Sequence, residues 1–150
     1  MTISTKHFGE IKYEESSIIT FPDGLPGFQE NTRYILLDNE DAEDDMFRWL
    51  QCVDNAEIAL AIMDVYPVIQ DYNPMVDEEA LADLGDLSGN PLEIYNVCVI
   101  PEDLRQMRVN LKAPIIINPA TRIGKQVVVQ NDEYKVRHHI FNDVQEEAGR

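Results

Sequence analysis

The apolar segments of this 150-residue chain are short, and most are bounded by turn-forming residues. This spacing is typical of an antiparallel β-sheet protein, because amphipathic helices need longer stretches with a period of about 3.6 residues. A run such as Ile58–Met63 is far short of the roughly 18 apolar residues that cross a bilayer as a helix. We therefore predict an all-β (mainly β) protein without a membrane span.

The predicted strands run through most of the chain. His7–Tyr13 and Ser17–Phe21 form a hairpin with an acidic turn, since β-branched residues favour the extended conformation of the second segment. The run Ile58–Met63 lacks polar alternation, which indicates a strand covered on both faces, with a buried helix as the alternative. Pro114 has no N–H donor, so its strand must lie at a sheet edge or contain a bulge. The other predicted strands are Tyr34–Leu37, Phe47–Cys52, Ile58–Val65, Leu92–Ile100, Arg108–Asn118, Gly124–Gln130 and Tyr134–Phe141.

Two short helical segments are expected between the strands. Residues 77–84 are predicted to be helical, because acidic residues in the first turn complement the helix dipole and Gly85 follows as a stop signal. Pro101–Leu104 can begin a helical turn, since proline suits the first helical position.

Length and cysteine content indicate one domain without a disulfide scaffold. A chain of 150 residues with 44% hydrophobic content can bury one core, so we expect a single domain over residues 1–150. Cys52 and Cys98 lie in predicted strands without a CxxC spacing, and we expect both to be reduced core residues. No N-terminal stretch combines positive charge with an apolar run, so we expect no secretory signal and a cytoplasmic protein.

The charge of the chain restricts its partners. Twelve basic and 28 acidic residues give a net charge of −16, and no cluster of Lys and Arg could follow a phosphate backbone, which excludes direct nucleic-acid binding. Residues 1–100 hold 4 basic and 21 acidic residues, a net charge of −17, whereas residues 101–150 hold 8 and 7, a net charge of +1. Such a field favours either solubility alone or encounter with a basic partner.

The two patterns that invite a metal-binding interpretation both fail. The acidic segment Asp38–Asp45 does not match a calcium loop, because counting from Asp41 puts Met46 where glycine is needed and Cys52 where a bidentate Glu is needed. We interpret it as a solvated loop, with contact to a basic partner as the alternative. His138 and His139 are neighbours on a predicted strand and point to opposite faces, so they cannot bind one metal ion together.

No catalytic motif is present in the sequence. It contains neither a nucleophile elbow, nor a phosphate-binding loop, nor a dinucleotide-binding fingerprint. We therefore expect no enzymatic activity, no cofactor and no metal. The alternative is a cryptic hydrolase or a carbohydrate-binding β-domain, since 28 acidic residues allow many carboxylate pairs.

A set of apolar and turn residues recurs along the chain without a chemical role of its own. The most specific element is Phe21–Phe28, FPDGLPGF, and Asn110–Ile115, NLKAPI, supports it. In their combination and order these motifs resemble the FliW family of bacterial flagellar assembly factors. Shorter elements of the same resemblance are Phe8-Gly9, Trp49-Leu50-Gln51, Asp71-Tyr72 and Gln126-Val127.

The resemblance implies a fold, a function and two partners. The implied fold is a small antiparallel β-barrel-like domain with one or two short helices, in agreement with the predicted strands. The implied function is that of a chaperone-like protein that binds flagellin and, when free of it, binds and antagonises the translational regulator CsrA, which relieves repression of flagellin synthesis. The net charge of −16 suits a partner that carries a basic RNA-binding surface.

Most motif residues are expected to shape the core and the loops, so contact residues are sought beside them. The expected contacts are polar or exposed residues next to the motifs, Phe28, Tyr72, Asn110 and Lys112, together with the acidic residues Asp41, Glu43, Asp44 and Asp45.

Overall fold

The computed structural model describes residues 1–6, 8–38, 47–85 and 91–140. The described residues form eleven strands, one α-helix and two short 3-10 helices, at Glu15–Ser17 and Leu104–Gln106, which confirms the predicted all-β class. The strands are β1 (Thr2–Thr5), β2 (Gly9–Lys12), β3 (Ile19–Thr20), β4 (Arg33–Asp38), β5 (Phe47–Cys52), β6 (Ala59–Met63), β7 (Glu93–Val99), β8 (Arg108–Val109), β9 (Ile115–Asn118), β10 (Ile123–Gln126) and β11 (His138–His139), and the helix is α1 (Glu78–Ala82).

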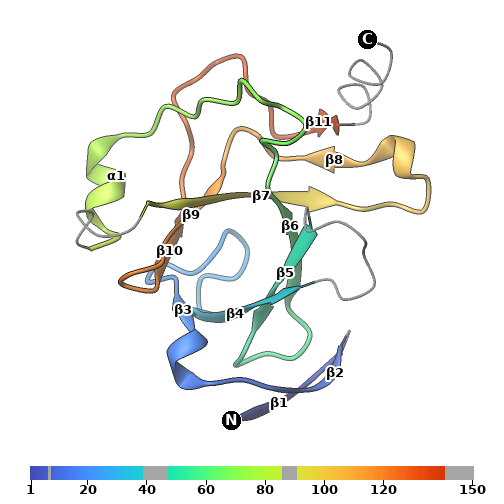
Figure 1. The fold of residues 1–150 in the computed structure, drawn as a ribbon, viewed down its shortest axis with the longest axis vertical. Helices are drawn as coiled ribbons and strands as arrows, with labels where there is room; N and C mark the ends of the chain where they lie inside the picture. The colour runs from blue at the N-terminus through green and yellow to red at the C-terminus, as the bar shows by residue number, and fades with distance from the viewer. Residues whose placement is uncertain (7, 39–46, 86–90, 141–150) are drawn as a thin grey trace.

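Seven of the strands close into a barrel, in the order β3-β4-β5-β6-β7-β9-β10 (Figure 1). The ring closes where β10 pairs with β3, and this is the one parallel pairing among antiparallel ones in the part of the chain that the structure describes. Beyond the ring, β8 and β11 extend the sheet from the C-terminal end of β7. The barrel expected from the resemblance is thus confirmed.

The N-terminal hairpin differs from the predicted one. Strand β2 pairs with β1, not with the segment around β3, and a 3-10 helix replaces the predicted turn. The turn between β1 and β2 is closed by Thr5, whose hydroxyl accepts from the Phe8 N–H and donates to the Gly9 carbonyl. Phe8 then packs edge-on against Trp49, with 5.4 Å between ring centroids, which attaches the hairpin to the barrel wall. The prediction placed Gly9 inside a strand, whereas Gly9 adopts φ +70° at the end of a turn that the Thr5 side chain closes.

The predicted strand Arg108–Asn118 is one extended segment interrupted by a bulge. Cys98 on β7 lies opposite Val109, and Tyr95 lies opposite Ile115, so β7 advances three residues while its partner advances six. The three extra residues leave the ladder between β8 and β9, where Pro114 lies. Of the two alternatives for Pro114, a sheet edge or a bulge, the structure shows the bulge, and we call residues 110–114 the β8–β9 bulge.

Three clusters of apolar side chains form the core. The first fills the barrel and includes Phe21, Tyr34, Leu50 and Ile62. Side chains alternate along a strand, so the neighbours of these residues on β5 and β6 face outward and build a second cluster with β7, β8 and Ile140. Burial of Cys52 in the first cluster and Cys98 in the second confirms the prediction that both are unpaired core residues.

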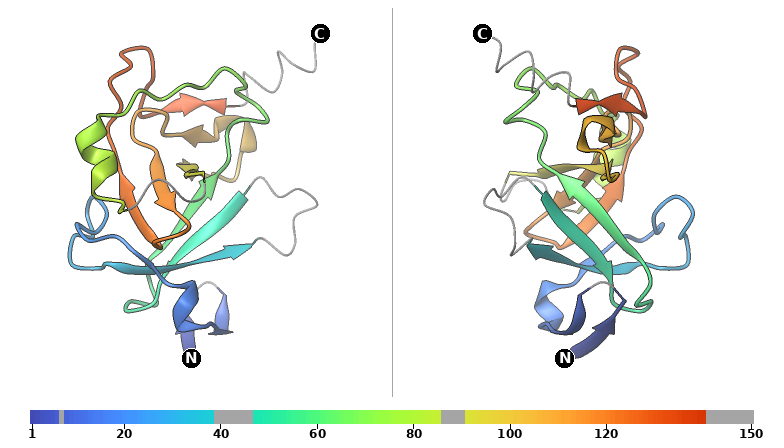
Figure 2. Two further views of the ribbon diagram at one scale, coloured as in Figure 1. Left: turned by 60° about the vertical axis from the view of Figure 1, so that its left-hand side comes forward. Right: turned by 90° about the vertical axis from the view of Figure 1, so that its right-hand side faces the viewer.

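Helix α1 covers the third cluster, on the outer face of β9 and β10 (Figure 2). The predicted helix at 77–84 is confirmed at Glu78–Ala82: the Asp77 carboxylate accepts from the Glu79 N–H at the start, and Gly85 adopts φ +89° at the end. The turn predicted at Pro101–Leu104 lies slightly later, at Leu104–Gln106. Ile58–Met63 contains strand β6, not a helix. No helix within the described residues is long and apolar enough to cross a bilayer.

Candidate functional site

The FPDGLPGF loop packs side chains into the core of the barrel. Phe21 and Leu25 are buried in the first core cluster, and the Phe28 N–H donates to the Leu25 carbonyl at 2.7 Å. Gly24 has φ +68°, and a Cβ there would lie 2.6 Å from backbone atoms of Phe28 and Gln29. Only glycine fits this position, so the motif shapes the loop, as predicted.

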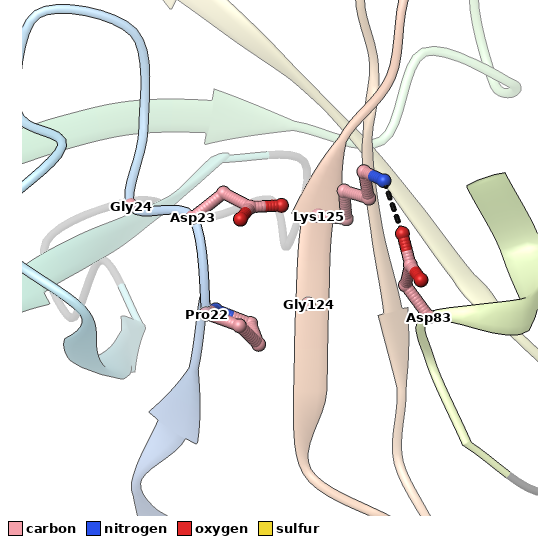
Figure 3. Close-up of a pocket in the computed structure, with 6 residues that line it drawn as sticks. All are labelled: Pro22, Asp23, Gly24, Asp83, Gly124 and Lys125. Carbon is pink, nitrogen blue, oxygen red and sulfur yellow. Dashed lines mark hydrogen bonds and ion pairs between the residues drawn. The ribbon is translucent and has the colours of Figure 1, made fainter.

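A polar hollow of about 250 Å³ lies between this loop and β10 (Figure 3). The Lys125 ammonium at its wall is paired with the Asp83 carboxylate at 2.5 Å, while the Asp23 side chain points across the hollow toward β10. A Cβ on Gly124 would lie 2.6 Å from the Phe21 ring, so this glycine lets β10 approach the loop. The lining residues are Pro22, Asp23, Gly24, Asp83, Gly124 and Lys125, which include no Ser, Thr, Cys or His.

A second hollow, of about 360 Å³, places Phe28 at the surface. The Phe28 ring is half-buried and packs on the barrel cluster, so one part of it is accessible while another part is core. Asn31 lies beside it, and the Cys52 thiol contacts the Asn31 side-chain oxygen at 3.9 Å. The lining residues, both apolar and polar, are Phe28, Asn31, Asn55, Glu57, Ile58, Ala59 and Leu60.

The second motif, NLKAPI, forms the β8–β9 bulge and is held by buried polar side chains. The Asn110 side-chain oxygen accepts from the backbone N–H groups of Lys112 and Ala113, both at 3.0 Å, which closes the turn. The amide nitrogen of Asn96 donates to the Asn110 carbonyl at 2.8 Å, and the Tyr72 hydroxyl donates to the Leu111 carbonyl at 2.8 Å. These bonds satisfy carbonyls that the bulge removes from the ladder.

Tyr72, one of the polar or exposed residues expected to contact a partner, is buried. Its side chain is 3% exposed, its ring packs against those of Tyr66 and Tyr134, and its hydroxyl accepts from the Asn96 amide at 3.1 Å. Burial raises the pKa of Tyr72 to about 12, although the bond from Asn96 opposes this shift. The residue keeps a neutral, hydrogen-bonded phenol inside the protein.

The structure brings together only part of the predicted contact set. Tyr72, Asn110 and Lys112 meet at the β8–β9 bulge, where the Lys112 ammonium donates to the Asn131 carbonyl at 2.8 Å. Phe28 belongs to a different core cluster. Asp41, Glu43, Asp44 and Asp45 lie outside the described residues.

Asn96 is the site residue that sequence reasoning missed. It is fully buried at the centre of β7 and bonds to both Tyr72 and Asn110. The available signal was its position, since a lone Asn inside the apolar alternation of residues 92–100 needs buried partners.

Comparison with known proteins identifies the family. The model of the FliW protein family matches residues 2–140, with the loop, the bulge and the barrel inside the match. The chain belongs to the FliW family. The flagellar assembly factor FliW of Lachnoclostridium phytofermentans is 42% identical over 149 residues, which cover 99% of this chain and 96% of the relative. That of Ruminiclostridium cellulolyticum is 36% identical, covering 98% of this chain and 99% of the relative.

A crystal structure of a FliW flagellar assembly factor superimposes with a TM-score of 0.86 at 30% identity, covering 94% of this chain and 97% of that one. Sequence and fold therefore agree on the FliW family across nearly the whole chain. The relatives are named for flagellar assembly, a description that names no reaction.

Proposed function

We propose that this protein is a non-enzymatic flagellar assembly factor that alternates between two protein partners. It binds flagellin as a chaperone-like partner. When flagellin is exported, the free protein binds CsrA, antagonises it and relieves repression of flagellin synthesis. Exchange between these partners takes place in the cytoplasm, where CsrA meets its RNA targets.

Membership of the FliW family, at 42% identity over nearly the full length of a named assembly factor, carries the proposal. Charge supports the CsrA arm, because a chain with a net charge of −16 complements a basic RNA-binding surface. The same charge repels RNA itself, so the antagonism acts through CsrA and not by competition on the nucleic acid.

We propose Phe28, Asn110 and Lys112 as contact residues for the partners. Phe28 is the best placed for an apolar contact with flagellin, since its half-buried ring borders an open hollow. Asn110 and Lys112 are half-buried and already bonded within the β8–β9 bulge, so a partner would meet them as part of a preformed surface. Tyr72 acts from inside by holding the bulge. Asp41, Glu43, Asp44 and Asp45 are proposed as long-range attractors of CsrA.

Isothermal titration calorimetry with purified monomeric flagellin, and separately with purified CsrA, tests the proposal. We expect saturable stoichiometric binding in both titrations and an association rate with CsrA that falls as the salt concentration rises. Absence of heat with flagellin at tens of micromolar would contradict the chaperone arm. Absence of binding to CsrA would contradict the regulatory arm.

A further inference from the structure

The edge of β7 that faces β6 is paired over only part of its length. Strand β7 crosses the end of β6 and pairs with it at Val97 and Asn96, opposite Ile62 and Met63 (Figure 1). After Met63 the chain turns away, and the Asp64 carboxylate fixes this turn by accepting from the Tyr66 N–H at 3.1 Å. The N-terminal half of β7 therefore continues beyond its β6 partner.

Strand alternation shows which backbone groups this leaves open. The Asn110 N–H donates to the Val97 carbonyl, so Val97 presents its backbone to the β8–β9 side. Neighbouring residues of a strand present their N–H and C=O groups to opposite sides, so Asn96 and Ile94 face the β6 side. Asn96 is paired with Met63, whereas no hydrogen bond reaches the N–H or C=O of Ile94 from any described residue on that side.

This open edge lies in a groove of about 390 Å³, which we call the β7-edge groove. Two tyrosine rings and two aliphatic side chains border it, together with two carboxylates. Its lining residues are Asp64, Tyr66, Leu92, Glu93, Ile94 and Tyr95, all half-buried. Backbone donors and acceptors beside alternating side chains are the features that receive an added strand.

The charge of the groove selects the occupant. Neither Asp64 nor Glu93 forms an ion pair with a described residue. The Arg48 guanidinium lies 5.8 Å from the centre of the Tyr95 ring, donates to the Tyr95 hydroxyl at 2.8 Å and is paired with Asp38, so it already occupies that ring. Two carboxylates without an ion pair attract Lys or Arg side chains through charge, and the Tyr66 ring adds an aromatic surface beside them.

We propose that the β7-edge groove binds an extended, basic segment of a partner protein, which adds to β7 as a strand and pairs with the backbone of Ile94. The identity of this partner rests on the proposed function. Of the two partners proposed there, CsrA is the one with a basic surface. Tyr66 links the groove to the β8–β9 bulge, since its ring packs 5.7 Å from that of Tyr72. A segment bound in the groove would therefore lie one side chain away from Tyr72, whose hydroxyl holds the bulge.

The variant Asp64→Asn/Glu93→Gln tests the charge requirement. It keeps the oxygen atoms that accept from the Tyr66 N–H and the Tyr95 hydroxyl, so the turn and the strand retain their bonds. Glu10→Gln/Glu14→Gln is the matched control, because it removes the same charge near the N-terminal hairpin (Figure 1). We expect CsrA affinity to fall roughly tenfold in the groove variant and by less than about twofold in the control.

Amide hydrogen exchange on the unmodified protein provides a second readout that requires no substitution. We expect the Ile94 amide to exchange rapidly in the free protein and at least about tenfold more slowly with CsrA bound, whereas the Tyr95 amide, which faces Ile115, is protected in both states. Equal CsrA affinity in the two variants, or an Ile94 amide that stays unprotected, would overturn the inference and leave the proposed function intact. Loss of flagellin binding alone in the groove variant would also overturn it. Failure of the unmodified protein to bind CsrA would overturn both.

Discussion

The Tyr72 hydroxyl donates to the Leu111 carbonyl at 2.8 Å, across 39 positions of the sequence. This bond joins the segment after β6 to the β8–β9 bulge, and the Asn96 amide bonds to the same hydroxyl. Two motifs that have no chemistry of their own, Asp71-Tyr72 and Asn110–Ile115, are therefore two sides of one contact.

Replacing Tyr72 with Phe removes this bond and keeps the ring. We expect the free energy of unfolding to fall by about 1–3 kcal/mol, because the buried Leu111 carbonyl and Asn96 amide each lose a partner. Tyr66→Phe is the matched control, since its hydroxyl makes no hydrogen bond with a described residue, and it should cost less than about 0.5 kcal/mol. Urea unfolding monitored by circular dichroism measures both values, and the same curves should show a single transition if residues 1–150 form one domain. Equal stability of the two variants would contradict this role of Tyr72.

Tyr34→Phe should have the opposite effect. The Tyr34 hydroxyl is fully buried in the barrel without a hydrogen-bond partner among the described residues. An unpaired buried hydroxyl costs free energy, so its removal should leave stability unchanged or raise it by up to about 1 kcal/mol. The same urea experiment applies, and a loss as large as that of Tyr72→Phe would reveal a partner for this hydroxyl.

Stability should decline at alkaline pH. Burial raises the pKa values of Tyr34, Tyr72 and Cys98 to about 12, from 10.0 for the tyrosines and 9.0 for the thiol. The unfolded chain therefore releases these protons first, so their contribution is complete below about pH 9 and is lost as the pH rises toward 12. Urea midpoints measured between about pH 8 and pH 11 should fall, and the fall should be shallower in Tyr72→Phe. Midpoints that are constant over this range would contradict the burial of these groups.

The two glycines of the FPDGLPGF loop should respond differently to alanine. Both have positive φ angles, +68° at Gly24 and +87° at Gly27, but a Cβ meets backbone atoms at 2.6 Å only at Gly24. We expect Gly27→Ala to cost about 1–2 kcal/mol from backbone strain alone. Gly24→Ala should cost clearly more, or prevent folding, because the loop must open to fit the methyl group. Thermal unfolding compares the two, and equal losses would show that the contact at Gly24 relaxes freely.

The sequence predicted those parts of the fold that depend on residues close to one another along the chain. The bounds of β5 follow from the alternation of its side chains, and α1 follows from its acidic first turn and Gly85. Because proline lacks a donor, the sequence restricted Pro114 to a sheet edge or a bulge, and it could not decide between the two. The β1–β2 hairpin was missed because a Thr5 side chain forms its turn.

The candidate site depends more on tertiary structure. Tyr72 and Asn110 were singled out through the family resemblance, but their shared role appears only when β7 brings Asn96 between them. The β7-edge groove has no signature in the sequence, since it exists because β6 and β7 cross over two residue pairs and then diverge. Local patterns cannot encode such a crossing.

The central claim is partner exchange, and a three-component displacement experiment tests it most directly. A fluorescently labelled RNA bound to CsrA is titrated with this protein while anisotropy is recorded, and flagellin is then added to the same mixture. The account predicts that the protein releases the RNA, and that flagellin restores the RNA–CsrA complex by occupying the protein. RNA that stays bound to CsrA at saturating protein, or RNA release that flagellin does not reverse, would contradict the account.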